Sequence, residues 1–277
     1  MRPLLVVDGD SFAHRAYHAI PKTIRRSDGG PGNALYGFAT MLMRLWQGES
    51  PRTVLVAWDT LEAPTYRHEA LTAYQAGREF DDELLEQLDL LPAVVASAGL
   101  AFAKAPGYEA DDFLGAAVAS EEARGGTVLV ATSDRDAFQL ASPRTTILQP
   151  VRGEAPARIG PAEVRERYGV DPEQVPDFIA LRGDPSDRIP GARGIGPKKA
   201  AELLAQYGSL NAVLDEGRFA AEADALRLYR EIATLDRSAP LPPLPDVSPD
   251  WSAAAGHARE LGMGGLASRF EEAASWT

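Results

Sequence analysis

Acidic side chains follow three apolar runs of the sequence, at the points where buried strands would end. Asp8 follows Leu-Leu-Val-Val, Asp59 follows Val-Leu-Val-Ala-Trp, and the pair Asp134 and Asp136 follows Thr-Val-Leu-Val-Ala-Thr-Ser. In an open α/β sheet, the carboxyl ends of the strands form the ligand-binding crevice. One aspartate after a strand is commonly a helix cap, and we expect Asp10 to be such a cap for a helix over residues 11–19. Acids after all three strands indicate a shared site instead.

Two further acidic clusters repeat a three-residue spacing, which places carboxylates on one face of a helix. They are Glu109 with Asp111 and Asp112, and Asp184 with Asp187. Acids in a first helical turn are also favoured by the helix dipole, so the first cluster alone would not define a site. Packed together, these carboxylates would raise each other's pKa. The nine candidate ligands are Asp8, Asp59, Glu109, Asp111, Asp112, Asp134, Asp136, Asp184 and Asp187.

Hard divalent cations would relieve that repulsion. Mg²⁺ and Mn²⁺ prefer carboxylate and water oxygens, and the chain has no cysteine and only four histidines to offer instead. A pair of such ions can activate a water molecule and stabilise the leaving oxygen of an in-line phosphoryl transfer. The acidic residues therefore predict metal-dependent phosphoryl chemistry.

A glycine-rich segment, Gly-Ala-Arg-Gly-Ile-Gly-Pro-Lys-Lys over residues 191–199, is a candidate phosphate-binding site. Glycines allow the backbone to approach a phosphate, and Pro197 suits a first helical position. The following helix would then present free N–H groups to an anion, beside two lysines. A glycine-rich turn that merely joins two structural helices is the alternative.

The overall composition is that of an ordinary globular protein, with a net charge of −12 that argues at first against nucleic acid. The charges are segregated, however. Residues 11–27 and 188–199 each carry four basic residues and no acid, whereas residues 79–89 carry six acids and no base. The absence of cysteine, of a secretory signal and of an apolar run of about 20 residues leads us to expect a cytoplasmic protein without membrane contact.

Short apolar runs without alternation predict three buried parallel strands, over residues 4–7, 54–58 and 127–131. Helical patterns lie between and after them, so the fold class is α/β. Helices are predicted over residues 34–46, 82–98, 109–124 and 161–168, with a further segment around 175–181. After Arg182 the pattern changes to glycine-rich turns and helices. A connector with five prolines, residues 239–251, leads to a last helical segment over 252–274.

Between about Leu4 and Leu235 the chain resembles the 5′-nuclease family, which comprises the flap endonucleases and the nuclease domain of bacterial DNA polymerase I. The resemblance rests on Pro-Gly-Tyr-Glu-Ala-Asp-Asp at residues 106–112, Ser-Asp-Arg-Asp at 133–136, and the Gly-Asp-Pro-Ser-Asp to Gly-Ile-Gly segment at 183–196. It implies a PIN-like core with a mostly parallel sheet in residues 1–175 and a helical arch at about 61–84. A helix–hairpin–helix DNA-binding region with a C-terminal helical tail would occupy residues 176–277.

The resemblance also implies roles for individual residues. One ion would lie among the acids up to Asp112 and a second among those from Asp134 onward, with two or more Mg²⁺ or Mn²⁺ ions in all. Arg67 and Arg78 match basic positions directed at the scissile phosphate or 5′ strand, and Arg15 matches another. The expected DNA contacts are Lys22, Arg193, Gly194, Ile195, Gly196, Lys198 and Lys199.

The expected activity is structure-specific 5′-3′ exonuclease and flap endonuclease cleavage of flapped, nicked or gapped duplex DNA. A monomer, a separate DNA polymerase as partner and a monovalent cation at the hairpin are further expectations. The family usually has lysine where this chain has Gln75, so either activity is reduced or a neighbour such as Lys22 or Arg78 substitutes. Two alternatives are a haloacid-dehalogenase-type phosphatase with Asp8 as nucleophile, and a DNA-structure-binding protein with little turnover.

Overall fold

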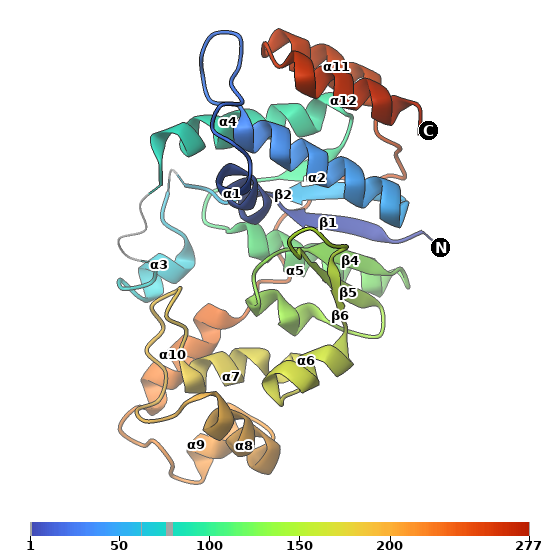
Figure 1. Ribbon diagram of the computed structural model, residues 1–277. Helices are drawn as coiled ribbons and strands as arrows, with labels where there is room; N and C mark the ends of the chain where they lie inside the picture. The colour runs from blue at the N-terminus through green and yellow to red at the C-terminus, as the bar shows by residue number, and fades with distance from the viewer. Residues whose placement is uncertain (1, 62, 76–79, 277) are drawn as a thin grey trace.

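A six-stranded sheet forms the centre of the part of the chain that the computed structural model describes, residues 2–61, 63–75 and 80–276 (Figure 1). The strands lie in the order β3-β2-β1-β4-β5-β6, and every pairing is parallel except β5 with β6. Their bounds are β1 (Leu4–Asp8), β2 (Thr53–Ala57), β3 (Ala101–Ala103), β4 (Val128–Ala131), β5 (Thr145–Gln149) and β6 (Ala157–Ile159). The three predicted strands correspond to β1, β2 and β4.

Both faces of the central strands are covered, which explains why their sequences are apolar without alternation. Leu4 and Val6 point into one core cluster and Leu5 and Val7 into the other, and all four are fully buried. Their neighbours in β2 and β4 divide in the same way, since side chains alternate across a strand.

One face of the sheet is covered by helices from both ends of the chain (Figure 1). These are α1 (Gly9–Ala19), α2 (Asn33–Glu49), α4 (Asp82–Ser97), α11 (Trp251–Glu260) and α12 (Gly264–Ala274). The helical segment predicted over 252–274 consists of the two helices α11 and α12. The chain turns at Gly262, whose φ of +69° is left-handed and whose position leaves no room for a Cβ beside Ser27.

The opposite face carries α5 (Ala110–Ala123), the 3₁₀ helix η1 (Asp136–Leu140) and α6 (Pro161–Tyr168). Beyond them lies a helical region at the end of the molecule remote from α11 and α12 (Figure 1). It contains η2 (Pro172–Gln174), α7 (Val175–Arg182), α8 (Pro197–Tyr207), α9 (Leu210–Asp215) and α10 (Ala223–Ala233). The short helix α3 (Tyr66–Ala70) contacts α10. Within the described ranges, no helix has the length and apolarity needed to cross a membrane.

Candidate metal centre

The strand order reverses direction between β1 and β4, and such a switch point is where open α/β sheets bind ligands. Asp8 is the last residue of β1 and also the N-cap of α1, since its Oδ1 accepts a hydrogen bond of 2.9 Å from the Ser11 backbone N–H. Its Oδ2 accepts one of 2.7 Å from the Thr132 hydroxyl, just after β4. The Thr132 hydroxyl and the backbone N–H of Ser11 thus hold the Asp8 carboxylate in place at the crevice.

The prediction that Asp10 caps the first helix is wrong. The helix begins directly after the strand, so the cap position falls on Asp8 and Asp10 lies within the first turn. There the Asp10 Oδ2 accepts a hydrogen bond of 2.7 Å from the backbone N–H of Asp59. Asp10 therefore joins the acidic site instead of closing a helix end.

Two cavities at this edge contain most of the predicted acids. The first, of about 460 Å³, is lined by Asp8, Asp10, Asp59, Glu109, Asp111 and Asp134 among others. The second, of about 360 Å³, is lined by Asp134, Asp136, Asp184 and neighbours. Because Asp134 lines both, the two predicted ligand groups lie side by side.

Burial and mutual repulsion raise the pKa of several of these carboxyls. Burial raises the pKa of Asp8 to about 7, helped by the charges of Asp59 and Asp134 and opposed by its two hydrogen bonds. Burial, followed by the charge of Asp134, also raises the pKa of Asp111 and Asp136 well above the ordinary value. The same two causes raise the pKa of Asp187 to about 6. The described residues therefore bring too little positive charge to these carboxyls to offset their burial and mutual repulsion.

The donor set fits a hard divalent cation. Oδ1 of Asp111 is buried and has no hydrogen-bond partner in the described part of the chain, so an acceptor is left over at the cavity. No three acidic or histidine side chains among the described residues already meet closely enough to hold an ion. Binding a cation would therefore draw these carboxylates together.

The raised pKa values predict how stability depends on pH in the absence of metal. A carboxyl whose folded-state pKa lies above its unfolded value stabilises the fold fully at low pH, and that contribution is lost as pH rises through the folded pKa. The shifts of Asp8 and Asp187 place the loss between the ordinary value of 3.8 and about 7. We expect the Tm in EDTA to fall from about pH 4 to about pH 7, and Mn²⁺ to restore it most at the higher pH. Thermal unfolding followed by circular dichroism measures this, and a Tm in EDTA that rises over the interval would contradict it.

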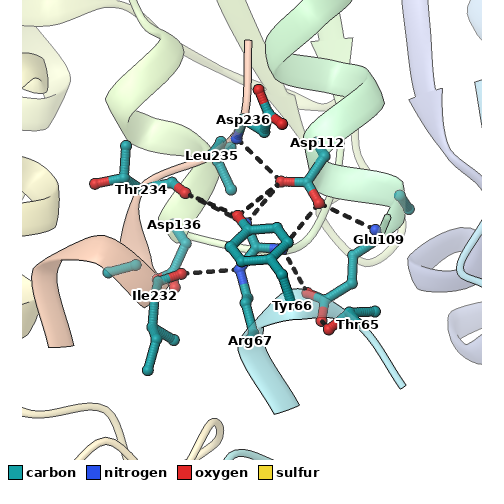
Figure 2. Close-up of polar contacts among 12 residues, drawn as sticks. Thr65, Tyr66, Arg67, Glu109, Asp112, Asp136, Ile232, Thr234, Leu235 and Asp236 are labelled. Atoms are coloured by element: carbon teal, nitrogen blue, oxygen red, sulfur yellow. Dashed lines mark hydrogen bonds and ion pairs between the residues drawn. The ribbon is translucent and has the colours of Figure 1, made fainter. Parts of the chain in front are cut away.

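Arg67 and Asp112 form an ion pair (Figure 2), and neither of them lines the first cavity. The guanidinium lies 2.7 and 2.9 Å from the two Asp112 oxygens and 3.2 Å from Glu109 Oε2. Arg67 is 1% exposed and Asp112 is 0% exposed. Each side chain thus neutralises the other inside the protein. Neither residue lines the two cavities, and their expected roles toward a phosphate and a metal ion stay predictions.

Arg15 and Gln75, which were singled out from the sequence, both line the first cavity. The Gln75 side-chain amide donates a hydrogen bond of 3.0 Å to Asp187 Oδ1. Arg78 lies outside the described residues.

The basic stretch near the N-terminus is paired with the acidic stretch that begins α4. The pairs are Lys22 with Asp81 at 3.0 Å, Arg25 with Glu83 at 2.9 Å, and Arg26 with Glu86. Lys22 also donates to the Tyr17 hydroxyl. The basic and acidic stretches, which are separate in the sequence, thus neutralise one another. To bind a phosphate, Lys22 would have to give up its contacts with Asp81 and Tyr17.

A tight loop positions Asp184. Its backbone N–H and C=O exchange hydrogen bonds of 2.8 Å with Ile189. Gly183 and Gly191 allow this crossing, since both have positive φ and a Cβ on Gly191 would lie 2.3 Å from the nitrogen of Gly183. Asp184 accepts a hydrogen bond of 3.0 Å from Arg182. Sequence reasoning did not single out Arg182, and only its position two residues before an acid could have suggested it.

The glycine-rich hairpin leads into the exposed start of α8. Gly196 is the N-cap, no side chain of the described residues caps the helix, and Pro197 is its first residue. Lys198 and Lys199 are exposed beside it. Gly194 has a φ of +75° and no described atom within 4 Å of its Cβ position, so the backbone is open on that side. These features suit a phosphate-binding helix start.

Comparisons with known proteins agree with this geometry. The model of the family "5′-3′ exonuclease, N-terminal resolvase-like domain" matches residues 3–169, and that of "5′-3′ exonuclease, C-terminal SAM fold" matches residues 170–250. DNA polymerase I of Mycobacterium tuberculosis is 40% identical over 255 residues, covering 88% of this chain and 28% of the relative. DNA polymerase I of Thermus aquaticus is 39% identical over 248 residues, covering 86% and 29%. The chain thus spans less than a third of these relatives.

Solved structures share the fold. A T5 5′-exonuclease with bound zinc superimposes with a TM-score of 0.70 at 19% identity, covering 99% of this chain and 100% of the other. The catalytic core of Rad2 with a DNA substrate gives 0.63 at 16% identity, covering 98% and 90%. The predicted α/β PIN-like core with a helical C-terminal region is confirmed, and the match does not favour the haloacid-dehalogenase alternative. The chain belongs to the 5′-3′ exonuclease family.

Proposed function

We propose that this chain is a structure-specific 5′-nuclease that hydrolyses DNA phosphodiesters with two divalent metal ions, Mg²⁺ or Mn²⁺. The observation that carries the proposal is the concentration of buried, poorly neutralised carboxylates at the switch point between β1 and β4. Two structures with a similar fold, a T5 flap endonuclease with DNA and metal ions and a Rad2 catalytic core with DNA, support it.

The carboxylates that line the two cavities would hold the ions, together with Asp187, which accepts a hydrogen bond from the cavity-lining Gln75. We assign the first ion to Asp8, Asp59, Glu109 and Asp111, and the second to Asp134, Asp136, Asp184 and Asp187. When bound, the ions supply an activated water and charge stabilisation for the leaving oxygen. Arg15, which lines the same cavity as the first group, would stabilise negative charge on the phosphate.

The hairpin before α8 would bind the duplex through its phosphates. Gly194, Gly196, Lys198 and Lys199 are exposed there, and no side chain of the described residues caps the start of the helix. The Ile195 N–H is not available, because it donates a hydrogen bond of 3.1 Å to the Ala192 carbonyl. Contacts of this kind position DNA without reading its sequence. The monovalent cation at the hairpin, a monomeric state and a DNA polymerase as partner also belong to the proposal.

Changing Lys198 and Lys199 together to alanine should weaken binding to all duplex sequences alike. Two lost phosphate contacts should reduce the slope of log affinity against log salt by about 1 to 2. Fluorescence anisotropy with labelled duplex at several salt concentrations measures the slope. Arg158→Ala, which removes an exposed arginine paired with Glu49, is the control and should leave the slope unchanged. The same slope in the double variant as in the wild type would place the duplex contact elsewhere.

A cleavage assay tests the proposed function. Labelled 5′-flap, nicked, gapped and single-stranded substrates are incubated with Mg²⁺, with Mn²⁺ or with EDTA. We expect cutting near the base of the flap with either ion and none with EDTA. Tight binding of the flap without cutting under any ion would favour the DNA-structure-binding alternative instead.

A further inference from the structure

Glu109, one of the proposed ligands of the first ion, is held by the base of the arch, residues 65–74. Its Oε1 accepts a hydrogen bond of 2.7 Å from the Thr65 hydroxyl. Its Oε2 accepts one of 3.0 Å from the Tyr74 hydroxyl and one of 3.2 Å from Arg67. Both oxygens of this carboxylate are therefore engaged by one segment of the chain.

The same contacts leave Glu109 able to bind a cation. An ionised carboxylate offers about four lone-pair directions, and three of them are taken here. Glu109 is the N-cap residue of α5, which fixes its backbone, and it lines the first cavity. One acceptor direction of Oε1 thus remains for an ion, while three donors fix the orientation of the group.

Arg67 extends this arrangement to the helical region (Figure 2). Its Nε donates a hydrogen bond of 2.8 Å to the carbonyl of Ile232, at the end of α10. Asp112, which Arg67 neutralises, accepts one of 3.0 Å from the backbone N–H of Asp236. The arch base, the start of α5 and the chain after α10 therefore meet around a single guanidinium.

We propose that Tyr74 and Arg67 are positioning residues for Glu109, and that cation binding at the first acidic cluster is thereby linked to the packing of the arch base. The inference rests on the proposed function, because Glu109 is a metal ligand only within it. Hydrogen bonds to a ligating carboxylate orient it for the metal. Thermodynamic linkage makes this effect reciprocal. If packing of the arch base raises the affinity for the ion by some factor, a bound ion stabilises that packing by the same factor.

Tyr74→Phe tests this role, since it removes one donor to Glu109 while keeping the ring. It also removes the hydroxyl that accepts a hydrogen bond of 3.1 Å from the Gln75 side-chain amide. The free Mn²⁺ signal in electron paramagnetic resonance, recorded on the full chain without DNA, gives the Mn²⁺ affinity. We expect the Kd to rise about tenfold, the lower end of the effect of losing such a partner. Arg67→Lys, which keeps the charge beside Asp112 but loses the planar fork, should act in the same direction.

Tyr36→Phe is the matched control. It removes the hydroxyl that accepts a hydrogen bond from Arg269 on the far side of the sheet, and it should leave the Mn²⁺ affinity unchanged. Raising the Mn²⁺ concentration should restore flap cleavage by Tyr74→Phe to the wild-type rate. A structural defect would not be rescued in this way.

Hydrogen exchange measures the reciprocal effect. The backbone N–H of Leu71 donates to the Arg67 carbonyl, and that of Asp236 donates to the Asp112 carboxylate. The exchange rates of peptides that contain Leu71 or Asp236 therefore report on the packing of the arch base. Mn²⁺ should slow their exchange in the wild type and less so in Tyr74→Phe. If the wild type and Tyr74→Phe bind Mn²⁺ equally well, the positioning role of Tyr74 is refuted while the proposed metal centre stands. If the wild type binds no Mn²⁺, the proposed metal centre itself fails.

Discussion

Changing Asp134 and Asp136 together to asparagine should abolish cleavage of a 5′-flap while leaving DNA binding intact or stronger. Asp134 lines both cavities, and its charge contributes to the raised pKa of Asp8, Asp111 and Asp136. Two neutral amides in place of two carboxylates would remove ligand charge from the second ion. We expect the single-turnover rate to fall by at least about 10³-fold, since losing even one electrostatic contact to a transition state costs about 10²- to 10³-fold.

The substitution is close to isosteric, so the fold should survive it. Asp134 Oδ1 accepts a hydrogen bond of 2.9 Å from the backbone N–H of Asp136, and an asparagine oxygen can accept the same bond. The control changes two exposed acids in the helical region, Asp215 and Asp224, to asparagine and should cut normally. Cleavage by the Asp134→Asn, Asp136→Asn protein at the wild-type rate would contradict the assignment of the second ion.

The second large effect concerns stability. Arg67→Met leaves the carboxylate of Asp112 buried at 0% exposure without its partner. Removing one member of a buried ion pair destabilises a protein by about 3 to 5 kcal/mol, because the remaining charge is neither solvated nor neutralised. We expect the midpoint of urea unfolding to fall accordingly.

Two further variants test that explanation. Arg227→Met removes an exposed arginine paired with Asp224 and should cost about 1 kcal/mol or less. Combining Arg67→Met with Asp112→Leu removes both charges and should recover part of the loss, since a hydrophobic replacement of a whole buried pair is often tolerated. An unfolding midpoint of Arg67→Met equal to that of the wild type would show that the pair does not stabilise the fold.

The strands β1, β2 and β4 could be predicted from sequence because burial on both faces leaves a plain apolar run. The inner strand β5 could not, since three of its five residues, Thr145, Thr146 and Gln149, are polar. β3 and β6 could not, since each has three residues and one of these, Phe102 or Arg158, is exposed at an edge of the sheet. The break between α11 and α12 was missed because only the contact with Ser27 makes Gly262 a chain reversal. These features depend on tertiary neighbours, which local pattern does not encode.

Asp8, Asp59 and Asp134 could be placed together from sequence because each follows a strand of the sheet, and in the structure they line one cavity. Ion pairs could not be predicted in this way. Arg67 and Asp112 are separated by 45 positions in sequence, and nothing local shows that they neutralise each other. The same holds for Lys22 and Asp81. The role of Asp10 was misassigned because a strand that runs directly into a helix shifts the cap to Asp8.

Anomalous diffraction from a crystal soaked in Mn²⁺ tests the central claim most directly, namely that these carboxylates share divalent cations. We expect one ion bound by Asp111 and a second by Asp134, with metal–oxygen distances of about 2.0 to 2.3 Å. Anomalous peaks that avoid both residues, in a crystal where Mn²⁺ binds elsewhere on the protein, would contradict it.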